Sequence, residues 1–219
     1  MGSVFLARHA PTDASASGRN LGGRNDAPLS AAGERLAGQL ARSIAAELAE
    51  LPHDQVRLVT SPALRCRGTL APIAAALGIG PDAIEVEPGL LEIDYGAWDG
   101  LTAEECLVRN PDLRAAWLSD PFATRCPGGE SGADVAARAL PVLGRLTDWA
   151  LADRARCAVV MAHNHVNRIV LADLLGWPMA DYRRRLSQDP AGYSLVSFGA
   201  DGPVVRRINA PAGPGGTGE

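Results

Sequence analysis

The sequence predicts an α/β fold, namely a three-layer α/β/α sandwich with a mainly parallel central sheet. Short apolar segments alternate with longer segments in which apolar residues recur at helical spacing. This alternation is typical of a sheet with helices packed on its faces. The 219 residues, 47% of them hydrophobic, are enough to bury one full core. Unusual polar residues directly follow several apolar segments, which is where open α/β sheets bind ligands.

The first half of the chain begins with an apolar run that predicts a strand at residues 4–7. A polar, glycine-rich loop follows at residues 11–28. Ser30 is then a suitable cap for a helix that runs to about Glu50, because leucines and an isoleucine recur there at helical spacing. The remaining elements of this half are a strand at residues 56–60, a helix at residues 63–77 and a strand at residues 83–86.

Residues 91–129 break this alternation, because prolines, glycines and aromatic residues interrupt short helical pieces. We expect an insertion that covers a site, with a lid built from about residues 100–125. The elements after it are a helix at residues 131–151, a strand at 157–162, a helix at about 166–175, and closing strands at 193–198 and 204–208. Residues 1–209 are expected to form one domain, and the glycine- and proline-rich residues 210–219 a disordered tail.

The charged residues exclude several classes of function. The formal net charge is -4 at pH 7, and all 21 basic residues are arginines. An acidic chain argues against nucleic acid as a partner. The absence of lysine excludes Schiff-base enzymes and P-loop nucleotide hydrolases. Arginine instead binds phosphate and carboxylate oxygens through its planar fork. The alanine- and arginine-rich composition further indicates a bacterial source with a GC-rich genome.

The chain is expected to be cytoplasmic, without a membrane partner. Arg8 and His9 interrupt the amino-terminal apolar run, which makes the run too short for a secretory signal, and no stretch of the sequence approaches membrane-spanning length. The four cysteines are widely spaced, without the pattern of a zinc site, and are expected to be free thiols.

Five polar side chains are expected at one edge of the sheet. Arg8 and His9 follow the first predicted strand, Arg65 the second, Glu92 the third, and His163 the most apolar one. Because the carboxyl ends of parallel strands meet at one edge, these residues should line one crevice. Two histidines, two arginines and a carboxyl group suit phosphoryl transfer without a metal. The arginines should lower the pKa of His9, and a bound phosphate should raise the pKa of Glu92.

Around these residues the sequence resembles the histidine phosphatase superfamily, branch 1, also called the phosphoglycerate-mutase-like family. Each matching segment is weak alone, but together they occur in order over most of the chain, which makes the resemblance specific. The segments are LARHAPT at residues 6–12, DAPLSAAG at 26–33, SPALR at 61–65, LEIDYGAWDG at 91–100, PGGES at 127–131 and VMAH at 160–163.

The resemblance implies a phosphatase that hydrolyses a small phosphorylated metabolite through a phosphohistidine on His9, with no cofactor and no metal. It also implies that Arg8, Arg65 and His163 hold the phosphoryl group and that Glu92 donates a proton to the leaving group.

Three segments depart from the family pattern near the expected phosphate. Ala10 replaces the usual glycine after the first histidine, which adds only a methyl group. The loop after Thr12 lacks the asparagine that many members place on the phosphate, and Ser15 or Ser17 is the candidate to replace it. After the second histidine the usual glycine-rich step reads Asn164-His165, and Asn164 is a further candidate phosphate ligand.

Two other functions remain open at this point. A phosphoglycerate-mutase-type phosphotransferase would use the same residues, and a catalytically silent module on this fold would bind a phosphorylated ligand. The sequence leaves the substrate and the oligomeric state undetermined. In the lid, Arg109, Arg114 and Arg125 either pair with a second anionic group or are solvated. The run Arg183 to Arg185 is expected to be a solvated helix face.

Overall fold

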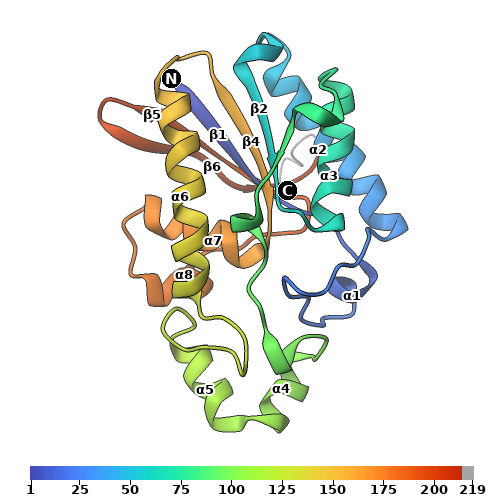
Figure 1. The fold of residues 1–219 in the computed structure, drawn as a ribbon, viewed down its shortest axis with the longest axis vertical. Coiled ribbons are helices and arrows are strands. Elements are labelled where there is room, and N and C mark those ends of the chain that lie inside the picture. The colour runs from blue at the N-terminus through green and yellow to red at the C-terminus, as the bar shows by residue number, and fades with distance from the viewer. Residues whose placement is uncertain (214–219) are drawn as a thin grey trace, which may run out of the picture.

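The computed structural model describes residues 1–213, and they form a six-stranded sheet covered by helices on both faces (Figure 1). The strands are β1 (Gly2–Arg8), β2 (Val56–Thr60), β3 (Ile84–Val86), β4 (Cys157–Ala162), β5 (Tyr193–Gly199) and β6 (Gly202–Ala210). Their order in the sheet is β3-β2-β4-β1-β5-β6. The first four strands in this order pair in parallel, whereas β5 and β6 pair antiparallel. The predicted sandwich with a mainly parallel sheet is confirmed.

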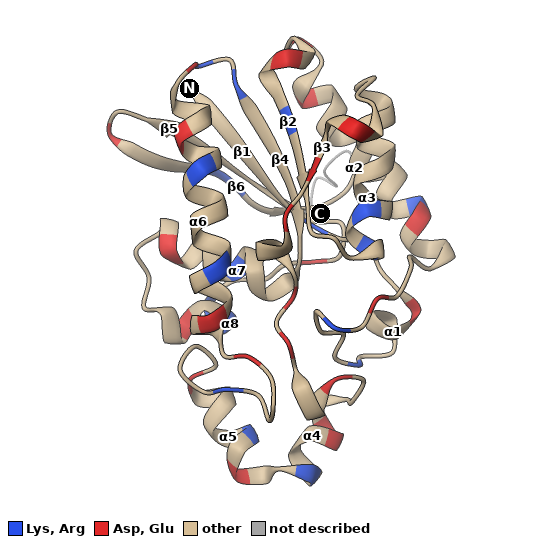
Figure 2. Ribbon diagram, in the orientation of Figure 1, with Lys and Arg blue, Asp and Glu red and all other residues tan. Residues whose placement is uncertain are grey.

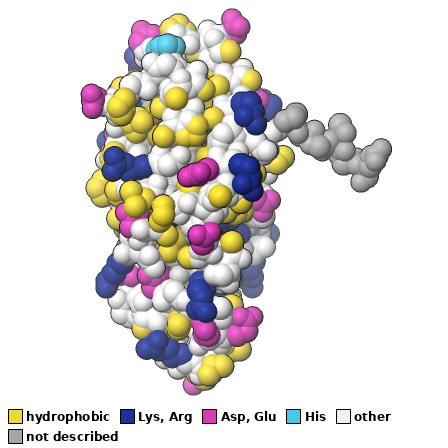
Figure 3. All heavy atoms as spheres, turned by 90° about the vertical axis from the view of Figure 1, so that its right-hand side faces the viewer, with side chains coloured by type: hydrophobic (Ala, Val, Ile, Leu, Met, Phe, Trp, Pro, Cys, Tyr) yellow, Lys and Arg dark blue, Asp and Glu magenta, His cyan; other side chains and the backbone are white. Residues whose placement is uncertain are grey.

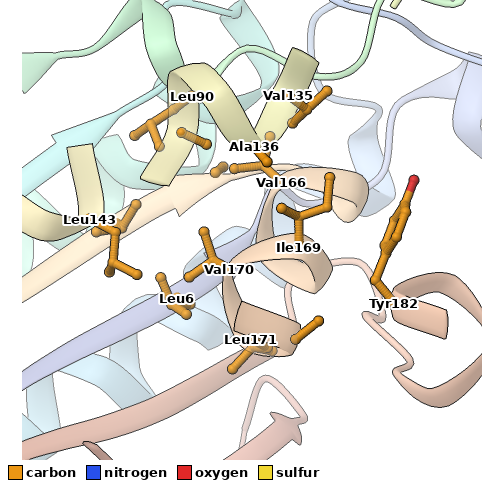
Figure 4. Packing of buried hydrophobic residues seen from close by; sticks show 14 of the residues in the cluster. Leu6, Leu90, Val135, Ala136, Leu143, Val166, Ile169, Val170, Leu171 and Tyr182 are labelled. Carbon is orange, nitrogen blue, oxygen red and sulfur yellow. The ribbon is translucent and has the colours of Figure 1, made fainter. Parts of the chain in front are cut away.

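Two pairs of helices make the outer layers and enclose two hydrophobic clusters. Helices α2 (Ala31–Leu48) and α3 (Leu64–Ala76) lie on one face, and α6 (Gly132–Leu151) and α7 (Asn164–Leu174) on the other (Figure 1). Leu6 of β1 packs beneath α6 and α7 with their buried residues (Figure 4), whereas its neighbour Phe5 belongs to the cluster under α2 and α3. Successive side chains of a strand point to opposite faces, so β1 contributes to both clusters.

Serine caps begin the two long helices at the predicted places. The Oγ of Ser30 accepts a hydrogen bond from the backbone N–H of Gly33. At α6, Ser131 and Asp134 form a capping box in which each side chain accepts from the other's backbone N–H. Gly33 itself is required, because a Cβ there would come within 2.1 Å of the carbonyl oxygen of Pro11. The cap of α2 is therefore also the point where the loop after β1 packs onto the helix.

Several element bounds differ from those expected. The short helix α1 (Asp13–Ala16) lies within the loop that was expected to be irregular. Helix α7 begins at Asn164, two residues earlier than expected, because helical geometry starts directly after His163. Ala210 is the last residue of β6, so the prediction that the tail begins at residue 210 was wrong. Residues 214–219 of the predicted tail lie outside the described residues.

The insertion forms two helices beyond the carboxyl ends of the central strands. Helices α4 (Ala103–Arg109) and α5 (Pro111–Ser119) lie at the bottom of Figure 1, below the ends of β1 and β4. Trp98 and Trp117 are buried in their core, with ring centroids 6.1 Å apart in an edge-to-face arrangement. The tryptophans therefore hold the insertion together.

Charged residues lie mainly on the helices and loops, and the central strands β1 and β4 are almost free of them (Figure 2). On the face that Figure 3 shows, positive and negative side chains are interspersed with hydrophobic ones. All four cysteines are buried and free, which confirms that prediction. Among residues 1–213, no helix combines the length and the apolar character needed to cross a bilayer.

Candidate active site

The carboxyl end of the sheet brings the two predicted histidines together. His9 follows β1 and His163 follows β4, and the neighbouring strands run in parallel. The two ring centroids are 5.2 Å apart, with the planes inclined at 64°. Both side chains are buried, at 5% and 0% exposure. The two rings therefore lie in edge-to-face contact and are shielded from bulk water.

A backbone contact fixes the tautomer of His9. Its Nδ1 lies 2.8 Å from the carbonyl oxygen of Ala10, and because a carbonyl oxygen only accepts, Nδ1 carries the proton. Ala10 is held in turn, since its N–H donates to the Thr69 hydroxyl at 2.9 Å, which donates to the Arg65 carbonyl at 2.7 Å. The Nε2 of His9 is thus left with a free lone pair. Alanine after the histidine fits this arrangement, because its methyl group is fully buried.

Burial is the main cause that holds the pKa of His9 well below its usual value, and the charges of Arg8 and Arg65 lower it further. Burial is also the main cause that lowers the pKa of His163, followed by the neighbouring His9 and Arg65. His9 is therefore neutral at neutral pH, as the sequence predicted, and a neutral imidazole is the nucleophilic form.

Arg65 is a fully buried guanidinium in the first turn of α3. Its Nη1 donates to the carbonyl of Asn25 at 2.8 Å and its Nη2 to the carbonyl of Gly22 at 3.3 Å, while its Nε has no partner among the described residues. Arg8 donates to the carbonyl of Gln188, and its Nε is likewise without a partner in residues 1–213. No carboxylate of that part of the chain lies within ion-pair distance of either guanidinium. Guanidiniums that lack a carboxylate partner in this way can bind an anion, which would stabilise their positive charge.

His163 is held by groups from the second strand-to-helix segment. Its Nε2 lies 2.8 Å from the Oγ of Ser61 and 3.4 Å from the Sγ of Cys66. Ser61 is held in turn by its backbone N–H, which donates to the carbonyl of Met161 at 3.0 Å. The ring of His163 is therefore fixed beside His9 rather than free to rotate.

Glu92 is the buried carboxyl group of the site, at 5% exposure. Its Oε1 accepts from the N–H of Ile93 at 2.9 Å and its Oε2 from the N–H of His165 at 3.3 Å. Burial raises the pKa of Glu92, while those two N–H groups and the nearby Arg65 and Arg8 oppose the rise. A carboxyl group with a raised pKa is suited to donate a proton near neutral pH.

The acidic neighbours of Glu92 are occupied elsewhere. Asp94 forms an ion pair with Arg24, Asp99 accepts from the backbone N–H of Gly22, and Glu130 forms an ion pair with Arg138. These three carboxyl groups thus brace loops rather than enter the site.

The predicted auxiliary phosphate ligands are not equally placed. The Ser15 hydroxyl is engaged in the capping box of α1, where it accepts from the N–H of Thr12 and donates to its carbonyl. Ser17 is exposed and donates to the carbonyl of Ala14. Asn164 is the first residue of α7, and its Oδ1 is buried without a partner in residues 1–213. Of the three, Asn164 lies next to His163 and has unused hydrogen-bonding capacity.

The site also contains groups that the sequence did not single out as ligands. Thr69 supports the loop that carries His9, and Gln188 supplies the carbonyl that holds Arg8. Thr69 lies four residues after Arg65 on α3, so its helical spacing was a usable signal. Gln188 is distant in sequence from the other site residues, and only the packing of its loop against β1 brings it there.

Buried neutral histidines make the stability of the fold depend on pH. Burial lowers the pKa of His9, His163 and His165 well below the ordinary value of 6.5. Below that value the unfolded chain binds three protons that the folded chain does not, so stability falls as the pH falls. The pKa values of Glu92 and Glu87 are raised in the folded chain, so the folded chain binds up to two protons that the unfolded chain does not. These protons oppose the loss of stability. Because at most two protons oppose three, the net loss approaches about 1.4 kcal/mol per pH unit, the value of one proton, only where the histidines of the unfolded chain are fully protonated.

Urea unfolding at about pH 7.5 and about pH 5.5 measures this effect as a difference in the free energy of unfolding. The His53→Gln variant, altered at an exposed histidine outside the site, should show the same pH dependence as the wild type. Equal stability at both pH values would contradict the burial of three neutral histidines.

Comparison with known proteins agrees with this arrangement. The profile of the histidine phosphatase superfamily (branch 1) matches residues 4–211. The bifunctional protein Rv2228c of Mycobacterium tuberculosis is 33% identical over 208 residues, which cover 94% of this chain and 53% of that protein. Glucosyl-3-phosphoglycerate phosphatase of Mycolicibacterium vanbaalenii is 31% identical over 184 residues, which cover 82% and 76%. The chain belongs to the histidine phosphatase superfamily.

Among solved structures, a mycobacterial glucosyl-3-phosphoglycerate phosphatase in complex with VO3 superposes with a TM-score of 0.80 at 26% identity, over 95% of this chain and 99% of that chain. The chain spans about half the length of the bifunctional mycobacterial relative. The match to the family nevertheless covers nearly the whole described domain.

Proposed function

We propose that the protein is a phosphatase that hydrolyses a small phosphomonoester through a phosphohistidine on His9. The observation that carries the proposal is the neutral His9, whose Nδ1 is bonded to Ala10 while its Nε2 is free. Beside it lie the guanidiniums of Arg8 and Arg65, whose buried Nε atoms have no partner among residues 1–213. A relative named as a glucosyl-3-phosphoglycerate phosphatase and one named as a phosphoserine phosphatase support this class of reaction.

In the first step the Nε2 lone pair of His9 attacks phosphorus, and the bond from phosphorus to the leaving oxygen breaks in line with it. Arg8, Arg65 and His163 hold the equatorial oxygens, where their hydrogen bonds stabilise the transferring phosphoryl group. The protonated Glu92 gives its proton to the leaving oxygen, which departs as an alcohol. The products of this step are a phosphohistidine and the Glu92 carboxylate.

In the second step water attacks the phosphorus of the phosphohistidine on the side that the alcohol has left. The Glu92 carboxylate takes a proton from this water, and the bond between phosphorus and Nε2 breaks. Inorganic phosphate leaves, His9 is again neutral, and Glu92 is again protonated. Each group thus returns to its starting state without a cofactor.

The four buried, free cysteines suit a reducing compartment such as the cytoplasm, and we place the enzyme there. Its partner is a small phosphorylated metabolite.

Phosphate release is expected to be independent of metal ions, because Arg8, Arg65 and His163 supply the positive charge and hydrogen bonds that a metal would otherwise supply. Turnover of p-nitrophenyl phosphate should change by less than about twofold when a chelator is added in excess. Removing a catalytic metal would lower turnover far more than this. Loss of activity in chelator that a divalent cation restores would contradict the proposed function.

A further inference from the structure

Arg114 in α5 is a buried guanidinium for which the surroundings supply no anion. Its side chain is 4% exposed, and its Nη1 is buried without a partner in residues 1–213. The carbon between its nitrogens lies 4.6 Å from the ring centre of Trp117 and 5.4 Å from that of Trp98. The other two lid arginines are accounted for: Arg109 is exposed and donates to a carbonyl, and Arg125 forms an ion pair with Asp134. Arg114 alone among these three lacks an oxygen partner within the described chain.

Two further arginines approach the same place from the core. Arg183 in α8 (Tyr182–Arg185) lies 4.9 Å from the ring centre of Trp117, so it shares that ring with Arg114. Arg168 in α7 donates weakly to the carbonyl of Arg183 at 3.4 Å. The Nε atoms of Arg168 and Arg183 are buried and unpartnered within residues 1–213. The prediction of a solvated helix face was therefore wrong for Arg183, while Arg184 is exposed and paired with Asp181.

The three guanidiniums repel one another. Burial is the main cause that lowers the pKa of Arg168, and the charges of Arg183 and Arg8 lower it further. Burial likewise lowers the pKa of Arg114, with Arg183 again contributing. Aromatic faces offset part of this repulsion, but a desolvated guanidinium needs oxygen acceptors for its fork of donors.

This cluster adjoins the proposed active site. The ring of His165 lies 5.9 Å from that of Trp117, and the backbone N–H of the same His165 donates to Glu92. The ring is fixed there because its two nitrogens contact the hydroxyls of Tyr95, at 2.9 Å, and Tyr182, at 2.6 Å. Arg168 is also close enough for the charges of Arg8 and Glu92 to act on its pKa. His165 therefore links the cluster to Glu92.

We propose that Arg114, Arg168 and Arg183 form a second anion site, which binds a carboxylate or a second phosphate group of the substrate. This inference rests on the proposed function and narrows it to phosphomonoesters that carry another anionic group. Arg114 and Trp117 belong to the insertion, whereas Arg168 and Arg183 belong to the core. The second anion therefore bridges the lid and the core while the phosphoryl group lies at the Nε2 of His9.

Two matched pairs of compounds test the site. 3-Phosphoglycerate and glycerol 3-phosphate differ by a carboxylate, and fructose 1,6-bisphosphate and fructose 6-phosphate differ by a phosphate. For at least one pair the wild type should prefer the compound with the extra anion by about 10-fold or more in kcat/KM, the effect of one charged hydrogen bond. The pair that shows the preference distinguishes a carboxylate from a phosphate.

Arg183→Gln should lower that preference by about 10-fold, because it removes one charge from the site. The adjacent Arg184→Gln is the matched control, since Arg184 is exposed and paired with Asp181. It should leave the preference within about twofold of the wild type, as expected for an exposed ion pair. A preference near unity in both pairs, or one that Arg183→Gln leaves intact, would overturn the second anion site.

The outcomes also separate this inference from the proposed function. Hydrolysis of all four compounds without preference leaves the phosphatase standing and removes only the second site. If the wild type hydrolyses neither these compounds nor p-nitrophenyl phosphate, the proposed function fails. The second site is then decided by dissociation constants of the same pairs, measured by calorimetry, with the same expected ratios.

A second variant tests whether Arg114 serves only packing. Arg114→Met keeps a side chain of similar length between the tryptophans and removes the unpartnered charge, so Tm should stay the same or rise by a few degrees. The preference for the second anion should nevertheless fall by about 10-fold. A lower Tm with the preference intact would show that Arg114 is structural.

Discussion

Replacing His9 with alanine is expected to lower kcat/KM for p-nitrophenyl phosphate by at least about 10⁴-fold, as loss of a covalent nucleophile does in other enzymes. The reason is that no other group at the site combines a free lone pair with a position beside the buried guanidiniums. The ring of His163 lies 5.2 Å away from that of His9, but its Nε2 contacts Ser61. Initial rates at several substrate concentrations, for the wild type and the variant, measure the effect.

A matched control separates loss of the nucleophile from loss of the fold. His53→Ala changes an exposed histidine outside the site and should retain the wild-type kcat/KM. The folded state of His9→Ala is checked by its Tm. A folded His9→Ala protein with activity within about tenfold of the wild type would be incompatible with a covalent role for His9.

Replacing Glu92 with glutamine should reduce hydrolysis of an alkyl phosphate by about 10²- to 10⁴-fold, the usual size of general acid catalysis. Glutamine keeps the shape and accepts one of the two backbone hydrogen bonds, from Ile93 or His165, through its single carbonyl oxygen. Its amide cannot donate a proton to the alkoxide. p-Nitrophenolate is a stable leaving group and needs no proton, so turnover of its phosphate ester should fall much less. The ratio of kcat values for the two esters, in the wild type and the variant, gives the result.

Glu104→Gln is the control for this comparison, because Glu104 is exposed on α4. Its ratio of the two rates should equal that of the wild type. An equal loss on both esters in Glu92→Gln would remove Glu92 from the role of proton donor and leave it as a group that shapes the site.

Much of the fold could be predicted because local pattern and global fold agree. Strands β2 and β4 have the expected bounds, since each is a short apolar run between turn residues. Ser30 and Ser131 cap their helices as expected, because a capping side chain acts on its own helix. The sequence did not predict that α7 begins at Asn164. Its cap residue is His163, whose side chain makes no capping hydrogen bond, so no sequence signal marks the first turn.

The candidate site was predictable where a side chain follows a strand directly, as His9 and His163 do. The sequence could not show that Ser15 caps a short helix, because this depends on the hydrogen bonds between its hydroxyl and Thr12. Nor could the sequence separate Arg183 from Arg184. Adjacent residues of a helix point in different directions, and here one meets Trp117 while the other meets Asp181. Such contacts depend on how the lid packs on the core, which no local pattern contains.

Trapping the covalent intermediate tests the central claim most directly. The wild type is mixed with excess p-nitrophenyl phosphate and quenched in alkali within its first turnovers, and the phosphorylated peptide is identified by mass spectrometry. A phosphate on His9 that is stable in base and labile in acid is the expected result. A phosphate on any other residue, or none while p-nitrophenolate accumulates in a burst, would contradict a mechanism through His9.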